Sequence, residues 1–319
     1  MPTTDTVGNP VIDTKGLTKW YGRVLAVDNL SLEVPRGGVF GLLGPNGSGK
    51  TTTMAMLLGL VRPTAGTIRL LGQETSGAHD KALRRIGAIV ETPAFYPYLS
   101  GRANLRYFQG MGSRGNREEV DRLLELVGLS GRANSRFATY SLGMKQRLGI
   151  AYALLGDPEL LFLDEPTNGL DPAGMAEVRE LVRGLGSAGR TVLLSSHLLH
   201  EVEQVCDRVA ILSRGRLIAQ GQVHDLLQQS RHVGVRLKTT DDARATAALG
   251  ALTWVKSVTT DNGCLLVAAP PERSWELTAA LAQQNIFVAE MAPVQASLES
   301  YFLAVTGNNG PPSGKEASP

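Results

Sequence analysis

Short apolar runs alternate with stretches of helical spacing along the first 220 residues of the chain. Four of these runs are residues 39–43, 86–91, 160–163 and 191–195, and each has the length of one buried strand. Apolar positions spaced as on one face of a helix follow them, for example in residues 51–61. Strands that alternate with helices in this way predict an α/β fold.

Two smaller groups of elements interrupt this alternation. Alternating runs around Val11–Thr14 and Leu30–Val34 predict a small antiparallel β subdomain before the strand at 39–43. Residues 102–111 and 117–129 show helical spacing one after the other, which predicts a helical subdomain.

Residues 220–306 form a separate segment with its own order of elements. After a helix at 223–229, the pattern predicts strand, helix, strand, strand, helix, strand, an order compatible with a small ferredoxin-like α+β domain. The expected strands are residues 232–237, 254–259, 264–268 and 286–289, and the expected helices are residues 241–249 and 272–284. We therefore expect a main domain over residues 11–219, a disordered leader at 1–10, an accessory domain at 220–306 and a disordered tail at 307–319, rich in Gly, Pro and Ser.

Composition narrows the class of protein. An apolar share of 43% and a charged share of 19% are typical of a globular chain with a real core. No run approaches eighteen apolar residues and the first ten are polar, so neither a spanning helix nor a secretory signal is expected. The formal net charge of +2, without a basic block, argues against nucleic acid as the main partner.

A glycine-rich loop joins the strand at 39–43 to the helix at 51–61. The loop reads, in order, Gly44, Pro45, Asn46, Gly47, Ser48, Gly49, Lys50, Thr51, which is the GxxxxGK[ST] pattern of a P-loop in its strand–loop–helix context. Glycines let successive amides point at one anion, and the helix adds its positive N-terminus. Lys50 is expected to neutralise the β- and γ-phosphates, and the Thr51 hydroxyl to hold Mg²⁺, with Thr52 as a further contact. The chance alternative, a turn before a helix, does not explain eight positions in register, so we predict a nucleoside triphosphate site.

Two carboxylates end the apolar strand at 160–163. Asp164 is expected to hold Mg²⁺ through water, and Glu165 to orient and polarise the attacking water. Two acids on a solvated turn are the alternative, but four apolar residues precede them. Downstream of a P-loop, these carboxylates supply what hydrolysis of a phosphate bond needs.

The strand at 191–195 ends at Ser196 and His197, and three roles are open for the histidine. It could donate a hydrogen bond to a γ-phosphate, or it could cap a helix at 198–205. It could also join His200 and Glu201 as a metal-binding face at helical spacing. We favour the phosphate role, because it needs no second cluster of ligands.

Aromatic residues mark two further places. Tyr21 precedes a glycine near the start of the chain and could stack on a purine ring or pack in a core or at an edge. Residues 95–99 read Phe-Tyr-Pro-Tyr-Leu in a chain with only 5% aromatics, and the prolines indicate a loop. Such a loop is a candidate contact surface, with rings tucked beneath it as the alternative.

Ser141 begins the stretch Ser-Leu-Gly-Met-Lys-Gln-Arg and stands where a helix N-cap belongs. Gly143 permits close approach of another group. Taken alone, this is only a capped helix. Beyond it, Asp171 in the turn at 166–172 lies near the start of another helix.

Together, the P-loop, the SLGMKQR stretch, LLFLDEPT, NGLDP and SSH resemble the motifs of ATP-binding subunits of ABC transporters, in that family's order over residues 11–219. SLGMKQR resembles a variant of the LSGGQ signature. The resemblance implies a P-loop ABC ATPase fold and a head-to-tail dimer, in which each ATP lies between one P-loop and the other subunit's signature. It places Tyr21 on the adenine, Ser141 and Gly143 on the partner's γ-phosphate, and Asp171 across the interface. One P-loop and one signature per chain agree with this, since two such domains are needed to complete two sites.

Some positions differ from the family pattern. Glu91 stands where the family usually has Gln, at the switch that touches Mg²⁺ and the attacking water, so it is a candidate metal and catalytic residue. Leu142 and Met144 replace a signature Gly and Gln. These changes, and the segment 296–303, look like the bacitracin, lantibiotic and drug-export branch.

The sequence thus predicts an ATPase that uses ATP and Mg²⁺ to drive a separate transmembrane permease in drug, antibiotic or peptide export. We expect a homodimer, or a second ATP-binding subunit, at the cytoplasmic face of the membrane. Cys206 and Cys264, which lack metal spacing, suggest reduced thiols in the cytoplasm. The alternative is a soluble ABC-type ATPase acting on ribosomes or DNA. It is disfavoured because the chain has neither tandem ATP domains nor long heptad helices. A small-molecule kinase does not explain the signature helix.

Overall fold

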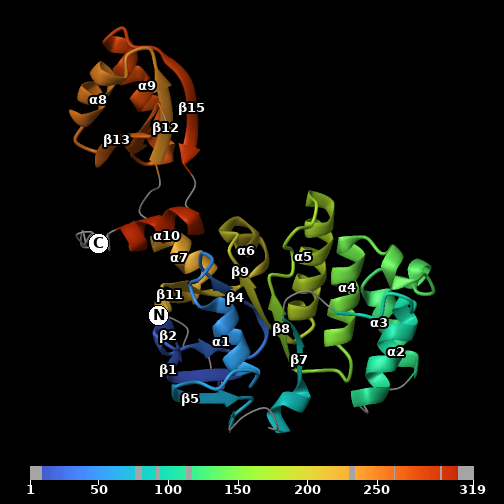
Figure 1. Cartoon of the computed structure of the whole chain (residues 1–319). Helices are drawn as coiled ribbons and strands as arrows, with labels where there is room; N and C mark the ends of the chain where they lie inside the picture. The colour runs from blue at the N-terminus through green and yellow to red at the C-terminus, as the bar shows by residue number, and fades with distance from the viewer. Residues whose placement is uncertain are drawn as a thin grey trace, which may run out of the picture. The chain divides into compact units, whose positions relative to one another are not determined.

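The structure is a computed structural model, and it describes residues 9–75, 81–90, 94–112, 117–229, 234–261, 263–294 and 297–307. The chain divides into two compact units, Met1–Val223 and His224–Pro319, which are considered separately below (Figure 1). No helix in these ranges is both long and apolar enough to cross a bilayer.

A six-stranded sheet lies at the centre of the first unit, with the strand order β11-β10-β4-β9-β8-β7. The strands are β4 (Gly38–Leu43), β7 (Ile86–Ile89), β8 (Leu160–Asp164), β9 (Thr191–Ser196), β10 (Arg208–Ser213) and β11 (Arg216–Gln222). All neighbours are parallel except β11, which pairs antiparallel with β10. The carboxyl ends of β4, β8 and β9 therefore meet at one edge of the sheet, where ligands bind in open α/β folds.

Helices cover both faces of this sheet, because alternate residues of its strands point to opposite sides. Phe40 and Leu42 of β4 belong to a buried cluster that also contains Met54 of α1 (Lys50–Leu57). On the other side, Val39 lies against Gly186 of α5 (Pro172–Ser187), and Gly41 against α6 (Leu199–Val205). The α/β prediction is confirmed.

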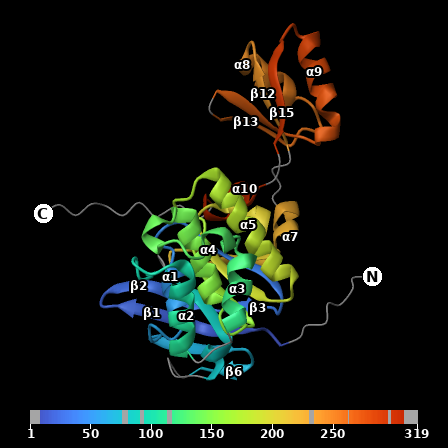
Figure 2. The same ribbon diagram turned by 90° about the vertical axis from the view of Figure 1, so that its right-hand side faces the viewer.

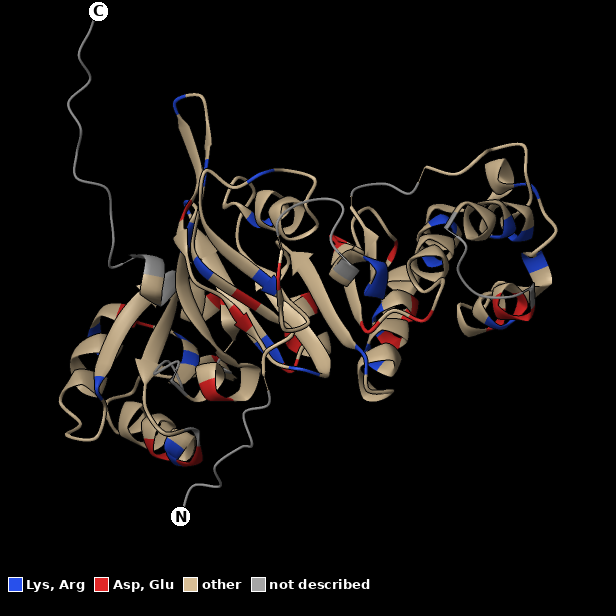
Figure 3. Cartoon of the chain, turned by 90° about the horizontal axis from the view of Figure 1, so that it is seen from below, with Lys and Arg blue, Asp and Glu red and all other residues tan. Residues whose placement is uncertain are grey.

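Two smaller subdomains complete the first unit, as the sequence predicts. The antiparallel sheet contains β1 (Ile12–Tyr21), β2 (Val24–Leu30), β3 (Glu33–Val34), β5 (Ala65–Leu70) and β6 (Gln73–Glu74). The helical part contains α2 (Gly101–Gly112), α3 (Arg117–Leu126) and α4 (Leu142–Ala153), which lie side by side in Figure 2. Basic and acidic residues are interspersed along the ribbon (Figure 3).

The second unit begins within α7 (Val223–Gln229) and folds around a four-stranded antiparallel sheet. Its elements are β12 (Gly234–Thr239), α8 (Asp242–Gly250), β13 (Ser257–Asp261), β14 (Cys264–Ala268), α9 (Ser274–Gln283), β15 (Val288–Val294) and α10 (Leu298–Gly307). The order β13-β14-β12-β15 puts the first and third strands in the middle. This is the arrangement of a ferredoxin-like domain, as predicted, and its core joins the sheet to α8 and α9.

The two cysteines are free. Cys206 is buried, and burial raises the pKa of its thiol well above the usual value, with the charge of Asp207 acting in the same direction. A thiol that stays protonated is a poor nucleophile and metal ligand. Cys206 is therefore a packing residue beside β4.

Candidate nucleotide site

The P-loop connects β4 to α1 through a backbone that only glycine adopts easily. Gly44, Gly47 and Gly49 have φ angles of 153°, 78° and 101°. A Cβ on Gly44 would lie 2.3 Å from the carbonyl oxygen of Leu212, and one on Gly49 2.7 Å from that of Ala26. Gly49 is also the N-cap residue of α1, so the loop leads into the positive end of that helix.

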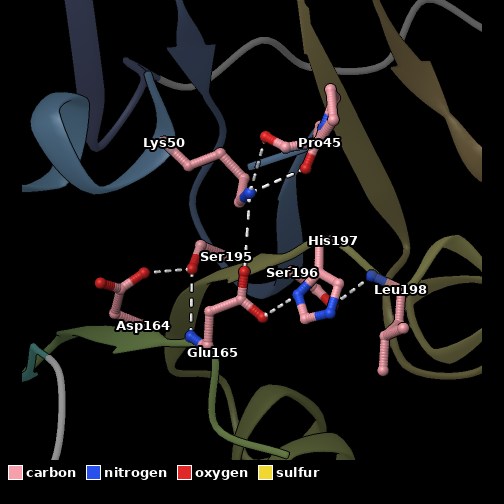
Figure 4. Close-up of polar contacts among 9 residues, drawn as sticks. Pro45, Lys50, Asp164, Glu165, Ser195, Ser196, His197 and Leu198 are labelled. Carbon is pink, nitrogen blue, oxygen red and sulfur yellow. Dashed lines mark hydrogen bonds and ion pairs between the residues drawn. The ribbon is translucent and has the colours of Figure 1, made fainter. Parts of the chain in front are cut away.

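Lys50 places its ammonium group inside this loop. The residue is 5% exposed, and its Nζ donates to the carbonyl oxygen of Gly44 at 2.7 Å and to that of Pro45 at 3.3 Å. The same nitrogen lies 3.5 Å from Oε1 of Glu165 (Figure 4). The P-loop lysine and the predicted water-polarising carboxylate thus face each other across the edge of the sheet.

Asp164 and Glu165 stand at the end of β8, and the neighbouring strand β9 holds both of them. Asp164 is 6% exposed, and its Oδ1 accepts a hydrogen bond from the hydroxyl of Ser195. The amide of Glu165 donates to the same hydroxyl at 3.0 Å and to the carbonyl oxygen of Ser195 at 3.2 Å. Glu165 has a φ of 48°, which is uncommon for a residue with a side chain and often marks a functional position.

His197 joins this group through Glu165. Its Nδ1 lies 2.7 Å from Oε2 of Glu165, and Figure 4 shows Lys50, Glu165 and His197 as one continuous line of contacts. A proton on Nδ1 would serve this carboxylate and leave Nε2 as the free ring nitrogen.

Neither alternative for His197 agrees with the structure. The N-cap residue of α6 is Leu198, whose amide donates to the hydroxyl of Ser196 at 3.0 Å rather than to His197. Of the other proposed metal ligands, His200 contacts Gln204 at 2.9 Å and Glu201 lies 3.3 Å from Arg179. The part of the chain that the structure describes contains no group of three His, Cys, Asp or Glu side chains suited to a metal.

The oxygen ligands at this edge fit Mg²⁺. Thr51 opens α1 directly after Lys50, and Asp164 supplies a buried carboxylate with its Oδ1 engaged by Ser195. Mg²⁺ is usually bound by one or two protein oxygens of this kind together with phosphate oxygens and water. Glu91, the third candidate, lies outside the described residues, so its role as metal ligand and catalytic residue stays a prediction.

A second group of predicted residues lies at the starts of α4 and α5. Ser141 is the N-cap residue of α4, as predicted, and its side chain accepts from the amide of Met144 at 3.3 Å. Asp171 caps α5 in the same way, through the amide of Gly174 at 3.1 Å. A Cβ on Gly143 would lie 4.0 Å from Gly174, so the two helix starts are neighbours.

Tyr21 ends β1 beside the turn to β2. Its side chain is 47% exposed, and Nζ of Lys19 lies 5.0 Å from the centre of the ring. The core-packing alternative is therefore wrong, and one end of β1 presents a ring and a cation to solvent. Both groups suit the base of a nucleotide, since aromatic rings stack on bases.

The aromatic residues of the loop at 95–99 differ in whether they are packed or exposed. Phe95 packs edge-on against Phe108, Phe137 and Tyr152, with ring centres 5.7, 5.1 and 6.0 Å away, so this ring is tucked beneath the loop. Tyr98 is 84% exposed. The contact-surface prediction therefore applies to Tyr98 and the half-exposed Tyr96, and not to Phe95.

The contribution of Ser195 was not foreseen. The sequence pattern places Ser195 only at the end of a strand, whereas in the structure its hydroxyl contacts both Asp164 and Glu165. The signal was the position itself, because the residue one strand over from Asp164 in a parallel sheet must lie beside it, and the register pairs Asp164 with Ser195.

Comparisons with known proteins agree with this geometry. The sequence model of the ABC transporter family matches residues 27–168. The chain is 36% identical to the bacitracin transport ATP-binding protein BcrA of Enterococcus faecalis, covering 94% of this chain and 97% of that protein. It is 37% identical to the daunorubicin/doxorubicin resistance ATP-binding protein DrrA of Streptomyces peucetius, covering 93% and 92%. A solved ATP-binding subunit of an ABC transporter superposes with a TM-score of 0.61 at 33% identity, covering 69% of this chain and 92% of that one.

Proposed function

The chain belongs to the family of ABC transporter ATP-binding proteins, and from that premise we propose that it powers an exporter of an antibiotic or related drug. Proteins of this family bind ATP, hydrolyse it to ADP and phosphate, and work with transmembrane permeases. Two relatives named above are described as acting in bacitracin transport and in daunorubicin and doxorubicin resistance. Because the similarity extends over more than nine-tenths of each chain, it includes the C-terminal unit as well as the ATPase core.

The single observation that supports hydrolysis at this edge is the line of contacts Lys50–Glu165–His197. We assign Lys50 to the β- and γ-phosphates, as a charge that offsets their repulsion. Glu165 takes the role of polarising the attacking water. His197 orients Glu165 through Nδ1 and, when both ring nitrogens carry a proton, donates to the γ-phosphate through Nε2. Mg²⁺, when bound at Thr51 and Asp164, supplies positive charge to the phosphate oxygens.

We propose that Ser141, Gly143 and Asp171 face the nucleotide that is bound by a second copy of the chain. These residues cap or open α4 and α5, and helix N-termini favour negatively charged groups. A head-to-tail dimer would bring this group to the partner's P-loop, with Tyr21 against the adenine. Ser141 and Asp171 already cap their own helices, so both side chains are oriented before any nucleotide arrives.

The permease contact is assigned to Tyr96 and Tyr98, at the cytoplasmic face of the membrane. Exposed tyrosines bury a large area at small entropic cost, which is typical of interface residues. The loop that carries them packs on the helical subdomain through Phe95. A contact made at Tyr98 can therefore move that subdomain, and with it the start of α4.

Export can be tested in bacteria sensitive to bacitracin and daunorubicin. The chain would be produced together with a candidate permease, chosen as a neighbouring reading frame with six apolar segments, and growth would be measured across drug concentrations. We expect resistance to at least one drug with the wild-type chain and none with Glu165→Gln. Unchanged sensitivity, with both proteins in the membrane and ATPase activity measurable, would contradict drug export. The competing role predicts instead that the chain co-sediments with ribosomes or binds DNA.

A further inference from the structure

Ser195 is a fully buried hydroxyl in the middle of the proposed catalytic group. It lies on β9 with 0% exposure, beside the end of β8. A buried hydroxyl that finds no partner is costly, so its contacts indicate what the position requires. All the side-chain contacts described for Ser195 are to Asp164 and Glu165.

The hydroxyl of Ser195 is a hydrogen-bond donor to one acidic residue and an acceptor from the other. It donates its one proton to Oδ1 of Asp164 and accepts the amide proton of Glu165 at 3.0 Å. The first bond fixes the rotamer of Asp164 through Oδ1, so that Oδ2 is the carboxylate oxygen that Ser195 does not contact. The second holds the backbone of Glu165 in its left-handed conformation, at a φ of 48°.

We propose that Ser195 is a positioning residue for ATP hydrolysis, which aims Asp164 at the Mg²⁺ site and Glu165 at the attacking water through one hydroxyl. The proposal rests on the roles assigned above to Asp164 and Glu165. Outer partners that orient metal-binding carboxylates typically contribute about 10–100-fold to metal affinity or activity. Ser195 has this place in the structure, with the addition that it also holds the backbone of the neighbouring acid.

The chain offers a matched control in the next residue. Ser196 is also buried, at 3% exposure, but its hydroxyl accepts the amide of Leu198 at 3.0 Å rather than contacting either acid. Ser195→Ala and Ser196→Ala therefore remove the same atom from adjacent positions of one strand. Ser195→Thr keeps the hydroxyl and is the conservative variant expected to restore function.

The test measures Mg²⁺ dependence in two ways. ATPase rates at saturating ATP give kcat and the Mg²⁺ concentration for half-maximal rate. Thermal melting at saturating ADP, with Mg²⁺ titrated, gives the metal midpoint without turnover, because ligands that bind the folded state raise the melting temperature. For Ser195→Ala we expect both midpoints to rise about tenfold and kcat to fall about tenfold or more, while ADP without Mg²⁺ still stabilises the protein.

Each outcome decides the proposal. The proposal is supported if the Mg²⁺ midpoints rise in Ser195→Ala and stay near the wild-type values in Ser195→Thr and Ser196→Ala. Unchanged midpoints and kcat in Ser195→Ala would overturn it, as would equal losses in Ser195→Ala and Ser196→Ala, which indicate packing alone. A wild-type protein whose ADP complex does not respond to Mg²⁺ would instead refute the assigned metal site, and with it the ground for the inference.

Discussion

Both ends of the six-stranded sheet carry charged side chains, but the two ends arrange them differently. At the amino ends of the strands, Glu159 before β8 pairs with Arg36 before β4 at 3.0 Å and with Arg85 before β7. Asp157 pairs with Arg190 beside them. These pairs lie at the surface, and each joins neighbouring or nearby strands. At the carboxyl ends, Lys50, Glu165 and His197 share contacts within a largely buried group.

The charged side chains at one end of the sheet stabilise the fold, whereas those at the other end face the proposed nucleotide site. The arginine partners lower the pKa of Glu159, chiefly through hydrogen bonds from Arg85 and then Arg36, so the carboxylate stays ionised to a lower pH than usual. At the other end, the P-loop glycines adopt positive φ angles that a residue with a side chain rarely adopts, and Glu165 has a left-handed backbone in spite of its side chain. One end joins strands, and the other presents groups to a ligand. Substitutions at each end should separate the two roles.

The largest effect is expected for Lys50→Ala at the carboxyl end. The change removes the charge that offsets phosphate repulsion. We therefore expect the loss of nucleotide binding itself, and not only a slower rate of hydrolysis. Equilibrium binding of a fluorescent ATP analogue measures this. Lys256→Ala, an exposed lysine of the second unit, is the control and should bind normally. Micromolar affinity in Lys50→Ala would show that another group carries the role.

Glu165→Gln should keep ATP binding and lower kcat by about 10²–10⁴-fold, because the amide retains the shape but cannot polarise the water as a carboxylate does. Phosphate release at saturating ATP measures kcat. The control is Glu159→Gln, the acid at the opposite end of the same strand, which should turn over normally. Wild-type turnover in Glu165→Gln would refute its assigned role.

The aromatic loop separates a packed ring from an exposed one. Phe95→Ser removes a ring from the cluster with Phe108 and Phe137 and should lower the free energy of unfolding by about 2–3 kcal/mol. Tyr98→Ser should leave stability and the ATPase rate of the isolated chain unchanged, yet uncouple the complex with its permease. Chemical denaturation and transport assays distinguish the two. Normal export by a complex containing Tyr98→Ser would remove the loop from the proposed interface.

The smallest effect is expected for Glu159→Gln. Exposed ion pairs contribute up to about 1 kcal/mol each, so the melting temperature should fall by a few degrees with kcat unchanged. The pKa of Glu159 is lower in the folded chain than in the unfolded one, so its contribution is present at neutral pH and is lost as the pH falls through the folded pKa. Melting curves of both proteins should therefore converge in acid. A constant difference at all pH values would contradict the assignment.

Much of the site could be predicted because its motifs are local. The P-loop, the carboxylates after β8 and the serine cap of α4 are each specified by a few consecutive residues. The hairpin of β10 and β11 was not predicted, although Arg214 and Gly215, with φ angles of 50° and 80°, form the tight turn that joins its strands. The pairing of β10 with β4, which holds the hairpin in the sheet, depends on the fold as a whole.

The contacts between strands were beyond reach for the same reason. Ser195 and Asp164 are far apart in sequence, and only the register of β8 on β9 brings them together. The helix expected at 51–61 ends at Leu57, because Gly59 adopts a φ of 69° that stops it. Tyr98 and Phe95 belong to one aromatic run, yet tertiary packing alone decides which ring is buried.

If ATP joins two copies of this chain at the carboxyl edge of the sheet, as proposed, the mass of Glu165→Gln in solution must depend on the bound nucleotide. Light scattering would be measured after size-exclusion chromatography, once with ATP and Mg²⁺ and once with ADP and Mg²⁺. We predict twice the mass of the single chain with ATP and the single-chain mass with ADP. A single chain in both nucleotides, with ATP shown to be bound, would contradict the account.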